Sequence, residues 1–518
     1  MKSPLRARRE ALEELWRQGL SGQALLRRHS RLVDEFVEEC FAQVEVAGAQ
    51  ESVAIVALGG YGRQELFPYS DIDLMVLFRP EIADDISKIA DAVLYPLWDT
   101  GLEVGHGVRS VAETVALAED DFFFRVSLLD ARFLSGSQLL YYEMLTAYKD
   151  SFIEGRRREF VEIMERYRQE RRTRFGSHSY LLEPHIKDGK GGLRDIQAML
   201  WTARAVYGLE GINGIVGAGI LTEEEQNAFV GSWNMLIRIR NRLHYISRRK
   251  NDQLYFEQQE EIAAAFSYED KAGALGVELF MREMYGHMQS IAVVTDLFFA
   301  HVAEVLDISG EGDLPDKVIE KGIELRRNRI HLIATSSEMR SKPHLLIRVF
   351  LAAIRFGVPL HHRSRKIVSA NLGLIDEKVR CSGRAAASFL AILEHPGDIA
   401  SVLGVMLETG VMSAYIPEFS KIETLAQHDV YHIYTVDRHS LQALDELHRT
   451  ITQEDDVFAM VESPRVLFLA ALLHDIGKGS GRDHSEEGAE IAAAVGRRLG
   501  LSDSECEDLG FVVRNHLY

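Results

Sequence analysis

The chain has 518 residues, too many for a single hydrophobic core, which predicts several domains. Its formal net charge of −19 argues against a general grip on nucleic acid, because phosphate contacts need clustered Lys and Arg. Three scattered cysteines, a basic start without an apolar segment, and no apolar run of about 18 residues predict a cytoplasmic protein with neither disulfides nor a membrane span.

Residues 53–78 hold the strongest pattern in the first half of the chain. Short β-branched apolar runs at 53–58 and 72–78 predict two buried strands. Gly59 and Gly60 follow the first strand. Without side chains there, backbone N–H groups can approach an anion closely, and phosphate is the obvious candidate.

Two acidic side chains, Asp71 and Asp73, enter the second predicted strand. The strand period of two puts both carboxylates on one face. They can converge on a hard divalent cation such as Mg²⁺, which keeps waters and substrate phosphate oxygens as its other ligands. A surface turn with two solvated acids is the alternative. Nearby Arg63, Ser70 and the apolar continuation of the strand favour a site.

This stretch resembles the nucleotidyltransferase superfamily of DNA polymerase β. The resemblance implies that the glycine turn holds a nucleoside triphosphate and that the paired aspartates hold two catalytic metals. The nucleotide-binding residues we expect are Gly59, Gly60, Arg63 and Ser70, and the metal-binding catalytic residues are Asp71 and Asp73.

Members of that superfamily usually carry a third carboxylate on a neighbouring strand. Residues 101–109 predict a third strand, preceded by an amphipathic helix over 82–98. Glu103 is our candidate for this catalytic role, and Asp99 is its competitor. Each is equally compatible with a solvated position at the strand edge.

A glycine-rich loop at 181–197 is the next candidate for phosphate contact. Pro184 stops regular structure there, and a helix is predicted from Asp195 to Tyr207. Cations beside a glycine-rich backbone would neutralise pyrophosphate as it leaves; a plain connection is the alternative. The cations are Lys187, Lys190 and Arg194.

Arginines are dense in the predicted helix at 152–174 and recur at Arg238 and Arg242, within a predicted helix over 223–249. A solvated face paired with Glu is the simpler interpretation. The alternative is that some of them contact a triphosphate or an acidic protein surface.

Histidines cluster in the last ninety residues. A buried helix at 467–473 delivers His474 and Asp475 at its C-terminal end, and further histidines lie on both sides in the sequence. Neutral imidazoles with a carboxylate suit Mn²⁺, Fe²⁺ or Zn²⁺, and such a metal activates water near neutral pH. A lone histidine on an apolar helix would instead be a core residue.

The His-Asp-Ile-Gly-Lys run with these flanking histidines resembles the HD superfamily of metal-dependent phosphohydrolases. The resemblance implies His439, His474 and Asp475 as the first metal ligands. It implies His484 and His516 as ligands of a second metal, and Lys478 near the phosphate. His428 and His432 are expected to be structural or at the rim. The HD pattern normally ends in another Asp, and the chain stops at Tyr518 before it. We therefore expect either a fragment or a site without its last ligand.

The order of the two patterns, with the Glu-Pro-His-Ile-Lys loop between them, resembles the bifunctional uridylyltransferase/uridylyl-removing enzymes of the PII nitrogen-signalling protein. The resemblance implies transfer of UMP from UTP to a PII tyrosine with Mg²⁺, and hydrolysis of that link at the HD site with Mn²⁺ or a similar metal. Glutamine acts on that family through ACT domains, to which nothing here corresponds, so truncation is expected.

The expected fold class is α+β and mainly helical, with a small mixed sheet, a helical lobe and an all-α HD domain. An RNA nucleotidyltransferase with an HD domain, of the CCA-adding type, is an alternative that the acidic charge disfavours. A nucleotidyltransferase with a non-catalytic HD module is another. The expected domains are N-terminal helices at 1–47, a catalytic domain at 48–140, a helical lobe at 141–308, a helical connection at 317–425 after a 309–316 linker, and an HD domain at 426–518.

Overall fold

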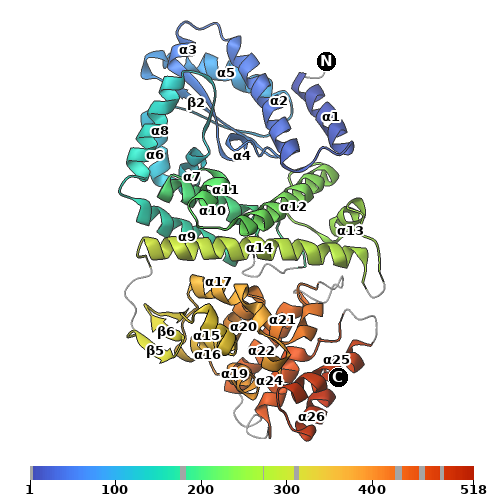
Figure 1. The fold of residues 1–518 in the computed structure, drawn as a ribbon. Coiled ribbons are helices and arrows are strands. Elements are labelled where there is room, and N and C mark those ends of the chain that lie inside the picture. The colour runs from blue at the N-terminus through green and yellow to red at the C-terminus, as the bar shows by residue number, and fades with distance from the viewer. Residues whose placement is uncertain are drawn as a thin grey trace. The chain divides into compact units, whose positions relative to one another are not determined.

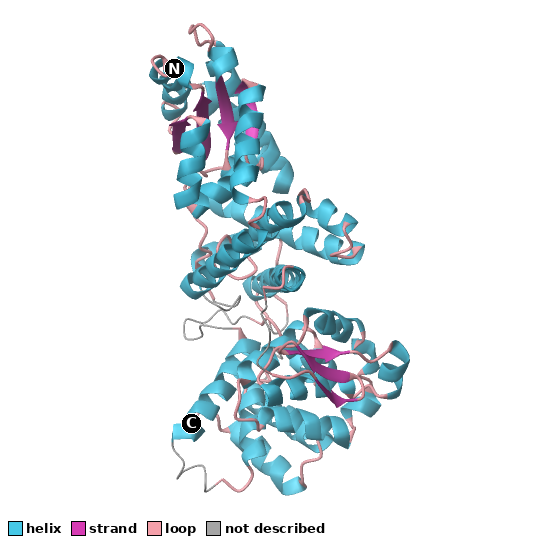
Figure 2. Cartoon of the chain, turned by 90° about the vertical axis from the view of Figure 1, so that its left-hand side faces the viewer, coloured by secondary structure: helices cyan, strands magenta, loops and turns pink. Residues whose placement is uncertain are grey.

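Helices form most of the protein, and the strands are confined to two small sheets (Figures 1 and 2), which confirms the expected fold class. The computed structural model describes residues 4–175, 182–271, 274–308, 314–425, 435–453, 461–478 and 483–517. The chain divides into two compact units. Unit 1 comprises residues 1–177, 185–258 and 290–298, and unit 2 comprises 178–184, 259–289 and 299–518. The finer domain boundaries expected from the sequence stay predictions.

Unit 1 combines one sheet with helices. Its strands are β1 (Val53–Ala57), β2 (Ile72–Phe78), β3 (Val104–Arg109) and β4 (Arg132–Gly136). Its helices are α1 (Pro4–Arg17), α2 (Gly22–Ala42), α3 (Ala49–Ser52), α4 (Gly59–Gly62), η1 (Pro80–Ile82), α5 (Ile86–Trp98), α6 (Val111–Asp120), α7 (Phe122–Leu129), α8 (Gln138–Phe152), α9 (Arg157–Phe175), α10 (Leu193–Tyr207), α11 (Gly211–Gly217) and α12 (Glu223–Ser247).

The sheet of unit 1 has the strand order β3-β2-β1-β4 and is mixed. β1 runs antiparallel to β2 and β4, whereas β2 and β3 are parallel. β1 is buried along its whole length, as a continuous apolar run predicts for a strand covered on both faces. Alternate residues of β1 and β2 pack with α2 and α5 in one hydrophobic core: Val53, Ile55 and Ala57 with Ile72, Leu74 and Val76.

That alternation fixes where the acidic pair lies. Because Ile72 and Leu74 face the core formed with α2 and α5, Asp71 and Asp73 face the opposite side of the sheet. The strand expected at 101–109 begins at Val104. The sequence pattern over 111–145 predicts helix, and β4 within that stretch differs from this prediction. The hydrophobic residues of β4 are too few to show a helical or a strand period. Its extended conformation therefore depends on pairing with β1.

Unit 2 carries a second, three-stranded antiparallel sheet followed by helices. The sheet was missed because 317–425 was expected to be mostly helical. Its strands are β5 (Lys317–Glu320), β6 (Ile323–Arg326) and β7 (Arg329–Leu332). The helices after it are α15 (Ser336–Ser341), α16 (Leu345–Phe356), α17 (His362–Ala370), η2 (Leu372–Leu374), α18 (Glu377–Arg380), α19 (Gly383–Leu393), α20 (Ile399–Glu408), α21 (Val411–Tyr415), η3 (Pro417–Lys421), α22 (Val436–Gln453), α24 (Pro464–Leu473), α25 (His484–Arg498) and α26 (Asp503–Arg514).

Two helices have residues in both units, α13 (Phe256–Ala265) and the long α14 (Gly276–Val305). Although no membrane span was predicted, α14 is long and apolar enough to qualify as one by length and composition. Core helices of soluble proteins meet the same criterion. Phe280, Met284 and Ile291 recur on one buried face, and Asp296 forms ion pairs within unit 1, so the described contacts are those of a helix packed in protein.

Candidate functional sites

The structure places Asp71 and Asp73 on the same face at the start of β2, as predicted. Burial alone would raise the pKa of Asp71, but the hydrogen bond and charge of Lys250 outweigh it and lower that pKa. Lys250 Nζ lies 3.0 Å from Asp71 Oδ1. Burial, followed by the charge of Asp71, raises the pKa of Asp73 to about 6. Two carboxylates that repel each other in this way suit a divalent cation.

Two glycines leave room around the carboxylate of Asp73. Gly59 has a φ of +53°, in the left-handed region that favours glycine, and a Cβ there would lie 3.0 Å from Asp73 Oδ2. A Cβ on Gly105 of β3 would lie 2.6 Å from Asp73 Oδ1. Any side chain at either position would therefore crowd the acidic pair. The glycine turn predicted from the sequence lies directly beside the predicted metal ligands.

A cleft of about 230 Å³ opens over this pair and is bordered by cations. Burial, then the nearby charges of Arg194 and Arg240, lowers the pKa of Lys187 to about 8. Cations crowded together in this way are stabilised by an anionic ligand. The residues lining the cleft include Gly59, Gly60, Arg63, Ser70, Asp71, Asp73, Lys187, Arg194, Gln197, Trp201 and Arg240.

Arg63 lines the cleft but is held by protein acids. Its guanidinium pairs with Asp130 and lies 2.8 Å from Glu65. The charges of these two acids outweigh burial and raise the pKa of Arg63. The Trp201 indole donates to Asp130 at 2.9 Å and completes the arrangement. Arg63 is thus rigidly oriented at the rim, with part of its charge already compensated.

The loop before α10 supplies Lys187 and Arg194, and a buried acid fixes it. Asp195 is fully buried, accepts the Gly191 N–H at 2.8 Å and pairs with Arg171. Burial opposes its charge, but the neighbouring arginines, Arg171 first, lower the pKa of Asp195. This explains part of the arginine density in α9 as structural support.

Lys190 does not line the cleft, although the sequence grouped it with Lys187 and Arg194. Its Nζ lies 3.9 Å from Asp296 Oδ2 on α14, and Arg172 contacts the same carboxylate. The loop therefore turns this lysine toward the supporting arginine cluster. A role for Lys190 in nucleotide binding stays a prediction.

Neither candidate third carboxylate is among the described residues that line the cleft. Glu103 precedes β3, and its carbonyl accepts the Ile72 N–H at 2.9 Å. The parallel register pairs Asp73 with Gly105, so Glu103 lies beside Asp71 on the same face of the sheet. Asp99 is exposed at the C-terminal end of α5. The register favours Glu103, whose role stays a prediction.

Lys250, Arg240 and Trp201 were missed as site residues. Arg240 falls between Arg238 and Arg242, the pair that the sequence singled out, and lies 2.6 Å from Asp252 and over the Phe67 ring. The helical spacing of these arginines gives no sign of which one faces the cleft. Tertiary packing of α12 makes that choice.

The second site is built around Asp475, which is 2% exposed. Two groups of possible metal ligands share this carboxylate, and in each group the ligand atoms lie within 4.8 Å of one another. One group is His439, His474 and Asp475, and the other is Asp475, His484 and His516. All five predicted ligands are therefore brought together, from α22, α25 and the turns after α24 and α26.

The imidazoles of this site are oriented as ligands. His474 Nδ1 lies 2.9 Å from the Ala471 carbonyl and His516 Nδ1 lies 2.6 Å from the Val513 carbonyl, so both rings donate through Nδ1. Nε2 of each faces Asp475, at 3.2 Å and 3.6 Å. Nε2 of His484 and of His516 is buried without a hydrogen bond from the described residues. These features fit a metal ion.

Lys478 and Gly477 lie in the turn after α24, close to Asp475. Lys478 Nζ lies 2.9 Å from Asp475 Oδ2. Burial opposes the charge of Asp475, but His474 and then Lys478 lower its pKa. A Cβ at Gly477 would lie 2.3 Å from the His484 carbonyl, so glycine lets the turn meet the start of α25. His428, His432 and most of the 309–316 linker lie outside the described residues.

Four family models match the chain. The DUF294 nucleotidyltransferase model covers residues 6–113, and the GlnD PII-uridylyltransferase model covers 159–299. The model of the third domain of uridylyltransferase GlnD covers 324–415, and the HD domain model covers 429–518. Each candidate site thus contains residues from a segment that matches a model with the corresponding chemistry.

Curated proteins named bifunctional uridylyltransferase/uridylyl-removing enzyme are similar to almost the whole chain. The protein from Ruegeria pomeroyi is 35% identical over 90% of this chain and 52% of its own length. The protein from Rhodospirillum rubrum is 34% identical over 98% of this chain and 56% of its own length. The chain thus spans about half the length of the curated relatives it matches. With these matches and the domain models, the chain is similar over nearly its whole length to bifunctional uridylyltransferase/uridylyl-removing enzymes.

Proposed function

We propose that this chain transfers UMP from UTP to a tyrosine hydroxyl of a PII signalling protein and hydrolyses the resulting phosphodiester. The observation that carries the proposal is the presence of two separate phosphoryl-transfer geometries. An acidic pair lies in a cation-lined cleft of unit 1, and a histidine cluster surrounds one buried acid in unit 2. The relatives' printed name supports the pairing of these two activities.

In the transfer reaction, the tyrosine oxygen forms a bond to the α-phosphorus of UTP, and the bond to pyrophosphate breaks. The backbone of Gly59 and Gly60 would lie against the triphosphate, and Lys187 and Arg194 would neutralise the departing pyrophosphate. Ser70 lies at the rim of the cleft and would donate to a phosphate oxygen. Arg63, held by Asp130 and Glu65, would orient the nucleotide.

Asp71 and Asp73 would hold Mg²⁺, which supplies charge neutralisation and lowers the pKa of the attacking hydroxyl when it is bound. Without it, Lys250 compensates only one of the two carboxylates directly. Glu103 is the proposed third carboxylate because it directly precedes β3 and its carbonyl accepts the N–H of Ile72, the residue after Asp71. Comparing Glu103→Gln with Asp99→Asn in the transfer assay tests this choice, since only the first should lose activity.

In the hydrolytic reaction, water adds to the phosphorus and the bond to the tyrosine oxygen breaks, which returns free tyrosine and UMP. His439, His474 and Asp475 would hold one Mn²⁺ or similar ion, with His484 and His516 available for a second. Such an ion provides nucleophilic hydroxide near neutral pH. Lys478, 6% exposed and directed at Asp475, would position that carboxylate and contact the phosphate.

The test incubates the purified chain with PII and UTP labelled in the α-phosphate. Label on PII supports the transfer activity, and its release as UMP after UTP is removed supports the hydrolysis. Mg²⁺ and Mn²⁺ are supplied separately to establish which ion each reaction needs. Titrating glutamine into both assays tests the effector that the resemblance implies. No label on PII with either metal would contradict the transfer half of the proposal.

A further inference from the structure

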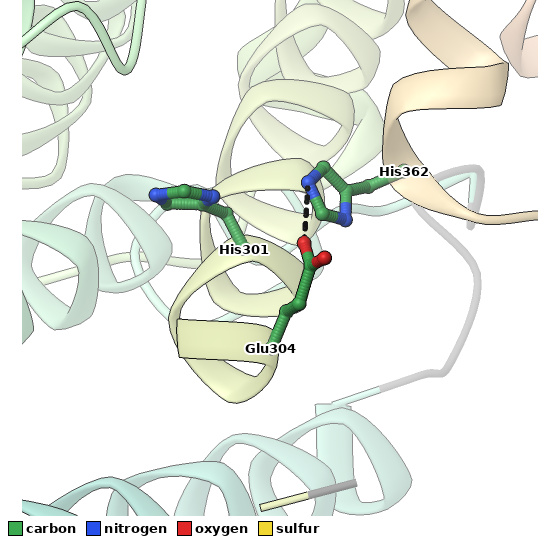
Figure 3. Close-up of side chains that lie close together, drawn as sticks. All are labelled: His301, Glu304 and His362. Atoms are coloured by element: carbon green, nitrogen blue, oxygen red, sulfur yellow. Dashed lines mark ion pairs between the residues drawn. The ribbon is translucent and has the colours of Figure 1, made fainter. Parts of the chain in front are cut away.

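A separate histidine and glutamate cluster lies in unit 2, formed by residues that neither reaction uses. His301 and Glu304 stand three residues apart near the C-terminal end of α14, so they share one helix face. His362 is the first residue of α17. One ligand atom from each of the three lies within 4.8 Å of the others. Figure 3 shows the Glu304 carboxylate directed at the His362 ring, with His301 on the neighbouring turn of the helix.

The distances in this cluster differ from those of direct hydrogen bonds. Nε2 of His361 and Nε2 of His362 each lie 3.4 Å from Glu304 Oε2. A direct N–H···O bond would be about 2.9–3.0 Å. In a tetrahedral zinc site with bonds of about 2.0–2.1 Å, adjacent ligand atoms lie roughly 3.3–3.4 Å apart. The spacing of Glu304 Oε2 and His362 Nε2 therefore matches two atoms that share a cation.

The Glu304 side chain is 37% exposed, but its Oε2 is buried and accepts no hydrogen bond from the described residues, which is costly for a carboxylate oxygen. A neutral imidazole offers one ring-nitrogen lone pair to a transition metal, which makes His301 and His362 suitable ligands beside Glu304.

Cations around the cluster decide which metal it suits. Arg363 Nη2 lies 3.6 Å from Glu304 Oε2, but its side chain is 66% exposed, so it compensates the carboxylate weakly. Arg329 also lies close enough to affect His362. Mg²⁺ and Ca²⁺ bind mainly through oxygen ligands and charge, which these arginines oppose. Zn²⁺ and similar ions bind strongly to neutral imidazole.

We propose that His301, Glu304 and His362 bind one Zn²⁺ or similar transition-metal ion. His361 caps α17 by accepting the Arg363 N–H at Nδ1, so its neutral ring carries the proton on Nε2, and this nitrogen is not available as a ligand. The ion would join the end of α14 to the start of α17. The site is thus a structural metal site, and it shares no ligand with the transfer and hydrolysis sites.

The test uses the full 518-residue chain with Asp475→Asn, which removes the carboxylate common to both other ligand groups. Excess Mg²⁺ occupies the Asp71 and Asp73 pair while Zn²⁺ is titrated against a chromophoric chelator. We expect one tightly bound Zn²⁺ per chain, which a further His301→Ala, His362→Ala double change abolishes. Co²⁺ should give the absorption spectrum of a tetrahedral site in the parent and not in this variant.

Glu304→Gln keeps the shape of the side chain and guards against misfolding of the double variant. Because loss of an outer-shell partner already costs about 10–100-fold in metal affinity, loss of this ligand should weaken Zn²⁺ binding at least about tenfold. Arg363→Gln should tighten binding, since it removes a competing cation. Unchanged Zn²⁺ affinity in Glu304→Gln, or equal stoichiometry in the parent and the double variant, would overturn the site.

Discussion

Acidic side chains serve the two candidate active sites in opposite electrostatic settings. In the transfer site, Asp73 lies beside Asp71, and burial together with that like charge raises the pKa of Asp73 to about 6. In the hydrolytic site, Asp475 lies beside Lys478 and His474, which lower its pKa despite burial. In the first site Lys250 pairs with Asp71 and leaves Asp73 beside a like charge, whereas in the second Lys478 pairs with the central carboxylate itself.

This difference indicates how each site depends on metal. A divalent cation at Asp71 and Asp73 relieves a repulsion that the protein leaves in place, so binding should be driven mainly by charge. At Asp475 a metal competes with Lys478, and binding should depend on the imidazole lone pairs. We therefore propose Mg²⁺ for the first site and a transition metal for the second.

The largest effect expected is loss of transfer without loss of hydrolysis. Asp73→Asn removes one of the paired carboxylates, and losing several kcal/mol of metal stabilisation corresponds to a rate loss on the order of 10³-fold. Labelling of PII by UTP measures it. Asp84→Asn, an exposed acid after β2, serves as the matched control. Equal transfer rates in the two variants would remove the acidic pair from the mechanism.

A change at the histidine site should have the opposite result, loss of hydrolysis without loss of transfer. Asp475→Asn should abolish UMP release from uridylylated PII, because both ligand groups share this residue, and leave transfer intact. Metal content measures the cause: Asp475→Asn should lose all metal of the HD site. His439→Ala and His484→Ala should each lose the metal of one group. If all three variants retained the parent's metal content, the shared-ligand arrangement would be wrong.

The next largest effect is expected from the buried ion pairs of Asp195, which hold the loop that carries Lys187 and Arg194. Asp195→Asn leaves three arginines without their fully buried carboxylate, and breaking such a pair costs roughly 3–5 kcal/mol of folding free energy. Denaturant unfolding measures the loss, and UTP binding should weaken as Lys187 and Arg194 shift. Glu165→Gln, which removes an exposed partner of Arg168, should change stability by about 0–1 kcal/mol. Equal stability of both variants would contradict a supporting role.

The smallest effect is a stability gain in metal-free protein. The folded-state pKa of Asp73 is raised, so its charge opposes folding above that pKa, and stability falls as pH rises from about 4 to about 6. Allowing for partial exposure, Asp73→Asn should stabilise the chain by about 1–2 kcal/mol at pH 7 in EDTA. Unfolding at pH 4 and pH 7 should show this gain only at the higher pH. A gain of equal size at both pH values would rule out the charge as its cause.

Local patterns determined the acidic pair and most of the element positions. The strands at 53–57 and 72–78 were predicted because apolar β-branched runs between glycines have few other solutions. The shared face of Asp71 and Asp73 follows from the strand period alone. The HD ligands were identified by resemblance, and the structure places all five together.

Other features needed the tertiary structure because they depend on contacts between distant segments. β4 forms through pairing with β1, and Lys250 reaches Asp71 across 179 residues of sequence. Lys190 lies near Asp296, which the sequence did not indicate, because a loop sequence does not fix the direction of its side chains. The sequence by itself indicated the kinds of chemistry that we propose for this chain. Packing between helices decided which cations face the cleft and which histidines meet Glu304, since burial and distance belong to the fold and not to the local pattern.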